Sequence, residues 1–305
     1  MIHNRRFVTT FLACVLVLFT AAFGMAQGAD FSVVYLDGSV ELMVASKWKA
    51  LDIGDTVAAD AMVRVSKDSS MQLSRAGVTL SFLTPGSFSV ADILSKNTKS
   101  AKSGVASTLG KTALALTGTS AKAQKTGTLG GVRASEAAKP KETLWVDELE
   151  EVRTQVKTYF TQEKFAEAVK LLEQTQAEGL SDAEAEEVSF LLASANYSQG
   201  ETAKAWKAVS SREPEPSSKF YSNILLMKAQ LLMEGYSFPE AVDVLKKLTG
   251  PASAPDTIQQ AWLLIGLCSR AQGDEPAAKD SWNKGIAVAP GSDVAGLIKD
   301  TMLVK

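Results

Sequence analysis

The chain has 305 residues with 32 basic and 34 acidic side chains, a length that allows two modest domains. It contains a single histidine, His3, and two cysteines, Cys14 and Cys268. With its only histidine at the extreme N-terminus, the composition argues against a Ser-His-Asp or Cys-His catalytic centre and against a histidine-containing zinc site. We therefore expect no catalytic residues, no metal and no cofactor.

Residues 1–26 have the pattern of a secretory signal peptide. Arg5 and Arg6 precede an uncharged run of 17 residues, and the small residues of Gly24-Met25-Ala26 follow it. The alternative is an uncleaved anchor, because a run of this length lies at the lower limit for spanning a bilayer. Cleavage after Ala26 leaves Cys268 as the last cysteine, which we expect to be a buried apolar residue without a disulfide partner.

The small net charge of −2 conceals three regions of different charge. Residues 143–305 hold 24 acidic and 16 basic side chains, whereas residues 93–142 hold 9 basic and only 2 acidic ones. The region before them, residues 29–92, is again acidic. This pattern predicts two domains, 29–94 and 145–305, joined by a basic linker at 95–142.

The first region has the two-residue periodicity of β-strands. Asp37-Gly38 separates two β-rich runs, 31–36 and 39–44, and this dipeptide predicts a hairpin because both turn residues tolerate positive φ. Four further strands are expected between turn-forming residues, at 62–65, 71–74, 78–83 and 87–90. Residues 29–94 are therefore predicted to form a small antiparallel β domain.

The order of motifs in this region resembles the FecR-type periplasmic domain. The matching segments are Asp37-Gly38-Ser39-Val40, Trp48-x2-Leu51-x2-Gly54-Asp55, Val63-Arg64-Val65, Asp68-Ser69, Pro85-Gly86-Ser87 and the later Gly130-Gly131-Val132-Arg133-Ala134. The resemblance extends the domain to residue 137. It implies an envelope signalling or scaffold module without enzyme activity, and hence a periplasmic location.

The basic middle, 95–142, is rich in Ala, Ser, Thr, Gly and Lys. It is interpreted as a flexible linker, a helix around Ser100 to Leu116, or both. Gly104-x5-Gly110-Lys111-Thr112 is similar to a phosphate-binding loop. We reject that interpretation, because the loop is one residue too long and no buried strand leads into it. The lysines either keep a connector soluble or touch an anionic surface such as lipid head groups or wall polymers. No aromatic residues are interleaved, so nucleic acid is not an expected partner.

The last region repeats one pattern of small residues, Ala168, Ala205, Ala241 and Ala278, with spacings of 37, 36 and 37 residues. The fourth unit is the most complete, with Trp262-x2-Ile265-Gly266, Gly273, Ala278, Trp282 and Pro290. This repeated motif resembles the tetratricopeptide (TPR) repeat. It predicts four helix pairs over 145–305, followed by a capping helix from Ser292 to Val304. The first unit lacks the turn glycine. In the third, the turn is predicted to be one residue longer, because Gly235 lies six residues before Ala241.

The TPR resemblance implies partner binding on the concave face lined by the first helix of each pair. Projecting the family register places there Arg153, Lys157, Phe190, Tyr197, Gln230 and Arg270. The tryptophans Trp206, Trp262 and Trp282 are expected in the core between helices.

Taken together, the sequence predicts an α+β protein with a small all-β FecR-like domain and an all-α TPR-like solenoid. The predicted function is a non-enzymatic periplasmic scaffold or adaptor for another envelope protein, membrane-anchored if the N-terminal segment is retained. The alternative is a cell-wall or anionic-polymer binding module that uses the β domain and the basic linker. An enzyme with paired carboxylates is disfavoured, because the neighbours Glu150-Glu151 and Glu186-Glu187 diverge by about 100° on a helix.

Overall fold

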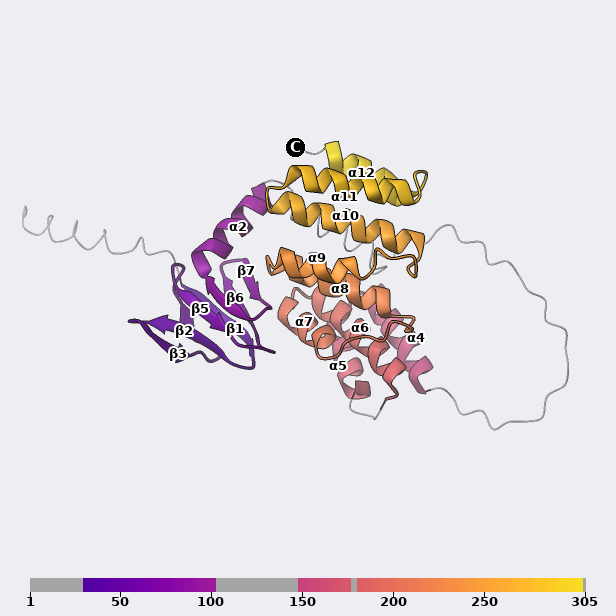
Figure 1. Cartoon of the computed structure of the whole chain (residues 1–305). Helices are drawn as coiled ribbons and strands as arrows, with labels where there is room; N and C mark the ends of the chain where they lie inside the picture. Colours follow the sequence, from indigo (N-terminus) through magenta and orange to yellow (C-terminus); the bar gives the residue numbers. More distant parts are fainter. Residues whose placement is uncertain (1–29, 103–147, 177–179, 304–305) are drawn as a thin grey trace, which may run out of the picture.

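The computed structural model describes residues 30–102, 148–176 and 180–303. Within these ranges a β region comes first and a helical region follows, which confirms the α+β layout with two domains (Figure 1). The predicted signal peptide and most of the predicted linker lie outside the described residues. No helix in the described ranges has the length and hydrophobicity needed to cross a bilayer.

The β region consists of two four-stranded antiparallel sheets, ordered β4-β1-β6-β7 and β3-β2-β5-β8. The two sheets share one hydrophobic core, because alternate side chains of each strand point toward the other sheet. In Met62–Val65, for example, both valines are at most 2% exposed, whereas Met62 is exposed. The strands are β1 (Phe31–Asp37), β2 (Val40–Val44), β3 (Lys47–Ala50), β4 (Thr56–Val57), β5 (Met62–Val65), β6 (Ser70–Arg75), β7 (Val78–Phe82) and β8 (Gly86–Ser89).

The hairpin predicted at Asp37-Gly38 is wrong. β1 pairs with β4 and β6, while β2 pairs with β3 and β5, so this dipeptide carries the chain from one sheet to the other. The positive φ of Gly38, 76°, serves this crossing rather than a hairpin. Two-residue hairpin turns with positive φ at both positions occur instead at Ala45-Ser46 and Ala76-Gly77.

A helix, α2 (Val90–Lys102), follows directly on β8. Its first residues belong to the β region, since Val90 and Ile93 are buried in the core of the two sheets. The helix therefore covers the first eight residues of the predicted linker, 95–102. The helix expected around Ser100 to Leu116 overlaps its end and otherwise lies outside the described residues.

The helical region consists of four successive helix pairs and a terminal helix, stacked one on another (Figure 1). The pairs are α4 (Glu148–Thr161) with α5 (Phe165–Gln176), α6 (Asp182–Ser198) with α7 (Thr202–Ser210), α8 (Tyr221–Glu234) with α9 (Phe238–Lys246), and α10 (Pro255–Ala271) with α11 (Glu275–Val288), followed by α12 (Asp293–Leu303). The four regularly spaced alanines lie one on each second helix, and all are fully buried. Any larger side chain there would separate the close-packed helices.

The two helices of every pair are joined by a three-residue turn. The middle residue of each turn has positive φ and stands five residues before the buried alanine, at Glu163, Gly200, Tyr236 and Gly273. The longer third turn predicted from Gly235 is therefore wrong, because Tyr236 and not the glycine takes the left-handed position. A residue with a side chain is strained there by roughly 1–2 kcal/mol, which the packing of the helices must offset.

The helical core includes the residues that the repeat pattern singled out. Trp282 and Cys268 are fully buried, while Trp206 and Trp262 are partly buried against the same core. Burial raises the pKa of the Cys268 thiol to about 12, so this side chain is a protonated apolar group at neutral pH. It has the properties of a structural cysteine rather than a nucleophile.

Candidate interaction surface and domain interface

The six predicted binding residues all lie on first helices of the pairs: α4 carries Arg153 and Lys157, α6 carries Phe190 and Tyr197, α8 carries Gln230 and α10 carries Arg270. Arg153 pairs with Glu187, and Tyr197 is hydrogen-bonded to Glu234. The Phe190 ring lies beside that of Phe220. Lys157 is exposed on α4. Gln230 is buried on α8, and Arg270 lies in the last pair.

Arg153 and Glu187 form a bidentate ion pair between α4 and α6. The Arg153 Nε and Nη2 atoms donate to Glu187 Oε1 and Oε2, each at 2.8 Å, and Lys219 Nζ lies 3.4 Å from Oε2. Burial alone would raise the Glu187 pKa, but the hydrogen bonds and charges of Arg153 and Lys219 outweigh it and lower the pKa. The carboxylate thus links the first pair to the loop before α8.

An aromatic patch adjoins this ion pair. The rings of Phe190 and Phe220 have centroids 6.0 Å apart, and the Lys219 ammonium lies 4.8 Å above the Phe220 ring. The Lys219 side chain is 66% exposed, whereas Phe220 is partly buried and Phe190 is buried, so the cation is the group that chiefly faces solvent here. Such groups favour contacts with another protein.

Glu234, at the end of α8, is a carboxylate with no cation paired to it in the described part of the chain. The Tyr197 hydroxyl donates to its Oε1, and Thr202 Oγ1 lies 3.5 Å from its Oε2. Although part of the residue reaches solvent, its carboxylate is packed among protein atoms, and this burial raises the Glu234 pKa despite the two hydrogen bonds. Burial of the Tyr197 hydroxyl, together with the charge of Glu234 and the hydrogen bond to it, raises the Tyr197 pKa.

Gln230 and Arg270 are both occupied inside the helical stack, Gln230 by burial and Arg270 by contacts with other helices. Gln230 is 4% exposed; its amide lies close enough to Tyr197 to lower that pKa slightly, yet its Nε2 makes no well-formed hydrogen bond in the described structure. Arg270 donates to both Glu275 oxygens at 3.0 Å and to the Thr301 carbonyl at 2.9 Å, and it stacks on Trp282. These contacts hold α10, α11 and α12 together and leave Arg270 little freedom to bind a partner.

Sequence reasoning missed the interface between the two domains. The Gln72 side chain accepts from the Ala203 N–H at 3.1 Å and donates to the Gly200 carbonyl at 3.2 Å, so one amide of β6 satisfies the turn before α7. At the next turn, the Thr84 and Ser237 hydroxyls form a buried hydrogen bond of 3.0 Å. The β region is thus attached to the turns of the second and third pairs.

Apolar and charged contacts extend this interface. Leu83, 2% exposed, belongs to the same core cluster as residues of α4 to α8, and an added Cβ on Gly235 would lie only 3.4 Å from it. At the rim, Lys207 Nζ pairs with Asp37 Oδ1 at 2.7 Å. No signal in a single sequence marks these pairs, because they join residues more than 100 positions apart.

Glu187 and Glu234 should give stability profiles of opposite sign with pH. A lowered pKa in the folded state means that ionised Glu187 stabilises the protein above its ordinary pKa and that this stability is lost as pH falls through the folded value. A raised pKa means that Glu234 contributes stability below its ordinary pKa that is lost as pH rises. Glu187→Gln should therefore cost about 1.5 kcal/mol near pH 7 and less in acid, since charge-assisted hydrogen bonds are lost.

The stability of Glu234→Gln relative to the unmodified chain should instead be highest near neutral pH, because glutamine keeps an acceptor for Tyr197 without a buried charge. Urea unfolding followed by circular dichroism at about pH 7 and about pH 4 measures both variants. Parallel pH trends for the two variants would contradict the assignment. Glu173→Gln, on the exposed surface of α5, serves as a control for the loss of one acidic group.

Comparison with known proteins supplies no family for this chain. No protein-family model matches it, and a search of curated proteins finds no match. Among the described residues there is also no group of three or more candidate metal ligands. The function must therefore be argued from the fold and its surfaces.

Proposed function

We propose that the chain is a non-enzymatic adaptor of the periplasm, built from a FecR-like β domain and a TPR-like helical solenoid. It binds another envelope protein through the first helices of its pairs. The observation that carries the proposal is the repeated geometry of the helical region: four pairs, four three-residue turns and four fully buried alanines at almost constant spacing. Stacks of this kind present long surfaces to partners.

The position of the β domain supports the same function. Its polar contacts reach the turns at Gly200 and Ser237 and the helix α7, which belongs to the second helices of the pairs. The cation and aromatic groups around Lys219 and Phe220 lie outside these contacts. The β domain therefore acts as a second module held on the solenoid, and the first helices stay available to a partner.

The proposal predicts that a charge reversal on a first helix weakens partner capture. Lys157→Glu, on the exposed side of α4, should reduce recovery of an envelope protein by about fivefold or more, because repulsive charges at an interface slow association. Lys170→Glu makes the same change on the exposed side of α5 and should leave recovery unchanged. The measurement is affinity capture from envelope extract with quantitative mass spectrometry.

Two outcomes count against the adaptor. Equal loss with both variants, or no protein enriched by the unmodified chain, removes the argument for a binding face on the first helices. Sedimentation of the chain with purified wall sacculi, unaffected by Lys157→Glu, would favour the anionic-polymer function instead.

A further inference from the structure

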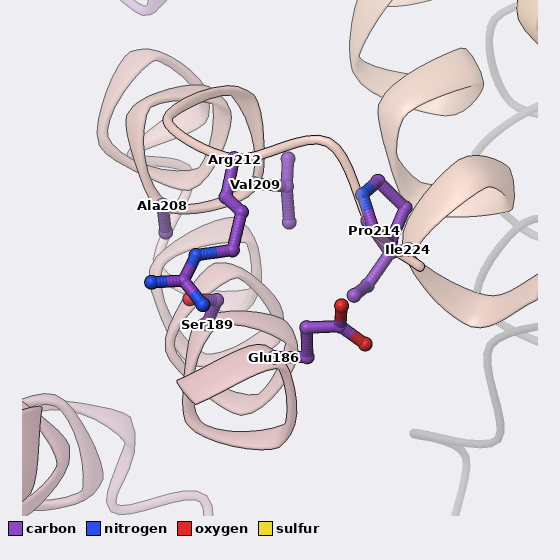
Figure 2. A pocket seen from close by; sticks show the side chains of 7 residues that line it. All are labelled: Glu186, Ser189, Ala208, Val209, Arg212, Pro214 and Ile224. Carbon is purple, nitrogen blue, oxygen red and sulfur yellow. The ribbon is translucent and has the colours of Figure 1, made fainter. Parts of the chain in front are cut away.

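A small pocket opens between the second helix pair and α8. It encloses about 210 Å³ of empty space, counted with its open mouth. The walls are apolar groups of Val209, Pro214 and Ile224, and α6 contributes Glu186 and Ser189 (Figure 2). The Glu186 carboxylate turns toward Pro214 and Ile224, while the Arg212 guanidinium lies on the other side, near Ser189 (Figure 2).

Glu186 is the unusual group in this pocket. The residue is 3% exposed, and its Oε1 accepts a hydrogen bond of 2.9 Å from the Glu215 N–H. Its Oε2 is buried and has no hydrogen-bond partner in the described structure. A buried acceptor without a donor costs free energy, and more so when the group is charged, so the pocket favours a ligand that donates a hydrogen bond.

The neighbouring charges do not supply that donor. Arg212 Nη1 is paired with Asp182 Oδ1 at 2.6 Å, and it is half exposed. Lys228, which is buried, donates to the Arg212 carbonyl at 3.0 Å and to Glu213 Oε2 at 3.2 Å. Both cations thus have their own acceptors, and no ion pair joins either of them to Glu186 among the described residues.

The size of the pocket selects among donors. Its interior has room for roughly one water-sized group. A primary ammonium has this size and carries the positive charge that complements a carboxylate, whereas a planar guanidinium is larger and has a fixed fork geometry. The apolar lining suits the methylene carbon next to a lysine ammonium, and the rest of the stem would lie in the open mouth.

We propose that this pocket is an anchor site for a lysine side chain of the bound partner, with the ammonium beside Val209 and Ile224 donating to Glu186 Oε2 and the stem leaving through the open mouth. The inference deepens the adaptor function and rests on it for the source of the lysine, another protein. The site itself can be tested without any partner.

The test uses n-butylammonium chloride as the probe and the full chain with labelled Ile and Val methyl groups. Nuclear magnetic resonance should show saturable shifts of the Ile224 and Val209 methyl signals at constant ionic strength. Binding of n-butylguanidinium and of n-butanol should be at least about tenfold weaker, because the first does not fit and the second lacks the charge. Glu186→Gln should weaken n-butylammonium binding by a similar factor, while the exposed control Glu173→Gln should not.

The comparison of the three probes on the unmodified chain decides the matter even if Glu186→Gln unfolds. Equal binding of n-butanol or n-butylguanidinium, or no saturable shift with n-butylammonium, overturns the site. These results do not depend on partner capture. Failure of the adaptor function therefore appears in the capture experiment alone, and failure of the lysine site appears in the probe experiment alone.

Discussion

Replacing Gly266 with alanine should lower the free energy of unfolding by about 2 kcal/mol, although alanine is the better helix former. Gly266 lies in α10 where Trp282 of α11 crosses it. An added Cβ would lie 2.5 Å from Trp282 Cδ1 and 2.6 Å from Cε2, distances at which one of the two helices must move. Urea unfolding followed by circular dichroism measures the loss.

Trp282 has no inexpensive way to avoid the added atom. The indole is fully buried, its Nε1 donates to the Leu263 carbonyl at 3.1 Å, and the Arg270 guanidinium covers the ring at 4.2 Å. Shifting the ring would weaken all three interactions at once. The overpacking penalty, typically about 1–3 kcal/mol and occasionally more, therefore exceeds the gain of about 1 kcal/mol from helix propensity.

The matched control is Gly296→Ala in α12, where an added Cβ meets no atom within 4 Å. This change should stabilise the protein by roughly 0.5–1 kcal/mol, so the two Gly→Ala variants should move in opposite directions. In addition, Trp282→Phe should cost less in the Gly266→Ala background than alone, because the smaller ring relieves the clash. A stabilised Gly266→Ala variant would show that the helices do not pack as described.

The regular part of the fold could be predicted because it follows from residue spacing. The buried alanines mark the second helix of each pair, and the α+β layout follows from the change between two-residue and helical periodicity. Two important side-chain pairs also follow the repeat: Arg153 with Glu187 and Tyr197 with Glu234 are 34 and 37 residues apart. A search for complementary groups one repeat apart would have found them.

Turn chemistry was less informative, because it indicates conformational freedom and not the strand that lies beyond the turn. Gly38 adopts the positive φ that its sequence suggested, yet the next strand joins the other sheet. Tyr236 shows the converse, since a residue without glycine's freedom occupies a left-handed position. Its ring packs against both the helical and the β core, so tertiary contacts override the local preference.

The domain interface depends on contacts that no local pattern encodes. Gln72 is a buried polar residue of a strand, and from sequence alone it would be placed on the solvent side of its sheet. In the structure its amide replaces water at the turn before Ala203, which is 131 residues further along the chain. Only the docking of the two domains makes this glutamine favourable, because each of its buried polar atoms then has a partner.

Replacing Gly38 with alanine should have the largest effect on the β region, a loss of about 3 kcal/mol, because strain and overlap add. The residue has φ of 76°, and an added Cβ would lie 2.9 Å from the Ser69 Cβ and still closer to its hydroxyl. That hydroxyl accepts the Ser39 N–H at 2.9 Å and donates to the Lys67 carbonyl at 3.2 Å. The side chain is therefore fixed where the new methyl group would have to go.

Gly77→Ala separates the two causes. Gly77 has a similar φ of 81°, but an added Cβ there meets nothing within 4 Å, so backbone strain alone should cost about 1–2 kcal/mol. The difference between the variants measures the overlap with Ser69, and it should shrink when Gly38→Ala is combined with Ser69→Ala, which removes the nearest atom. Equal losses of stability for Gly38→Ala and Gly77→Ala would show that the added methyl group at Gly38 does not overlap Ser69, and would contradict the close approach of these two residues. Thermal unfolding of the full chain, followed by circular dichroism, provides the measurement.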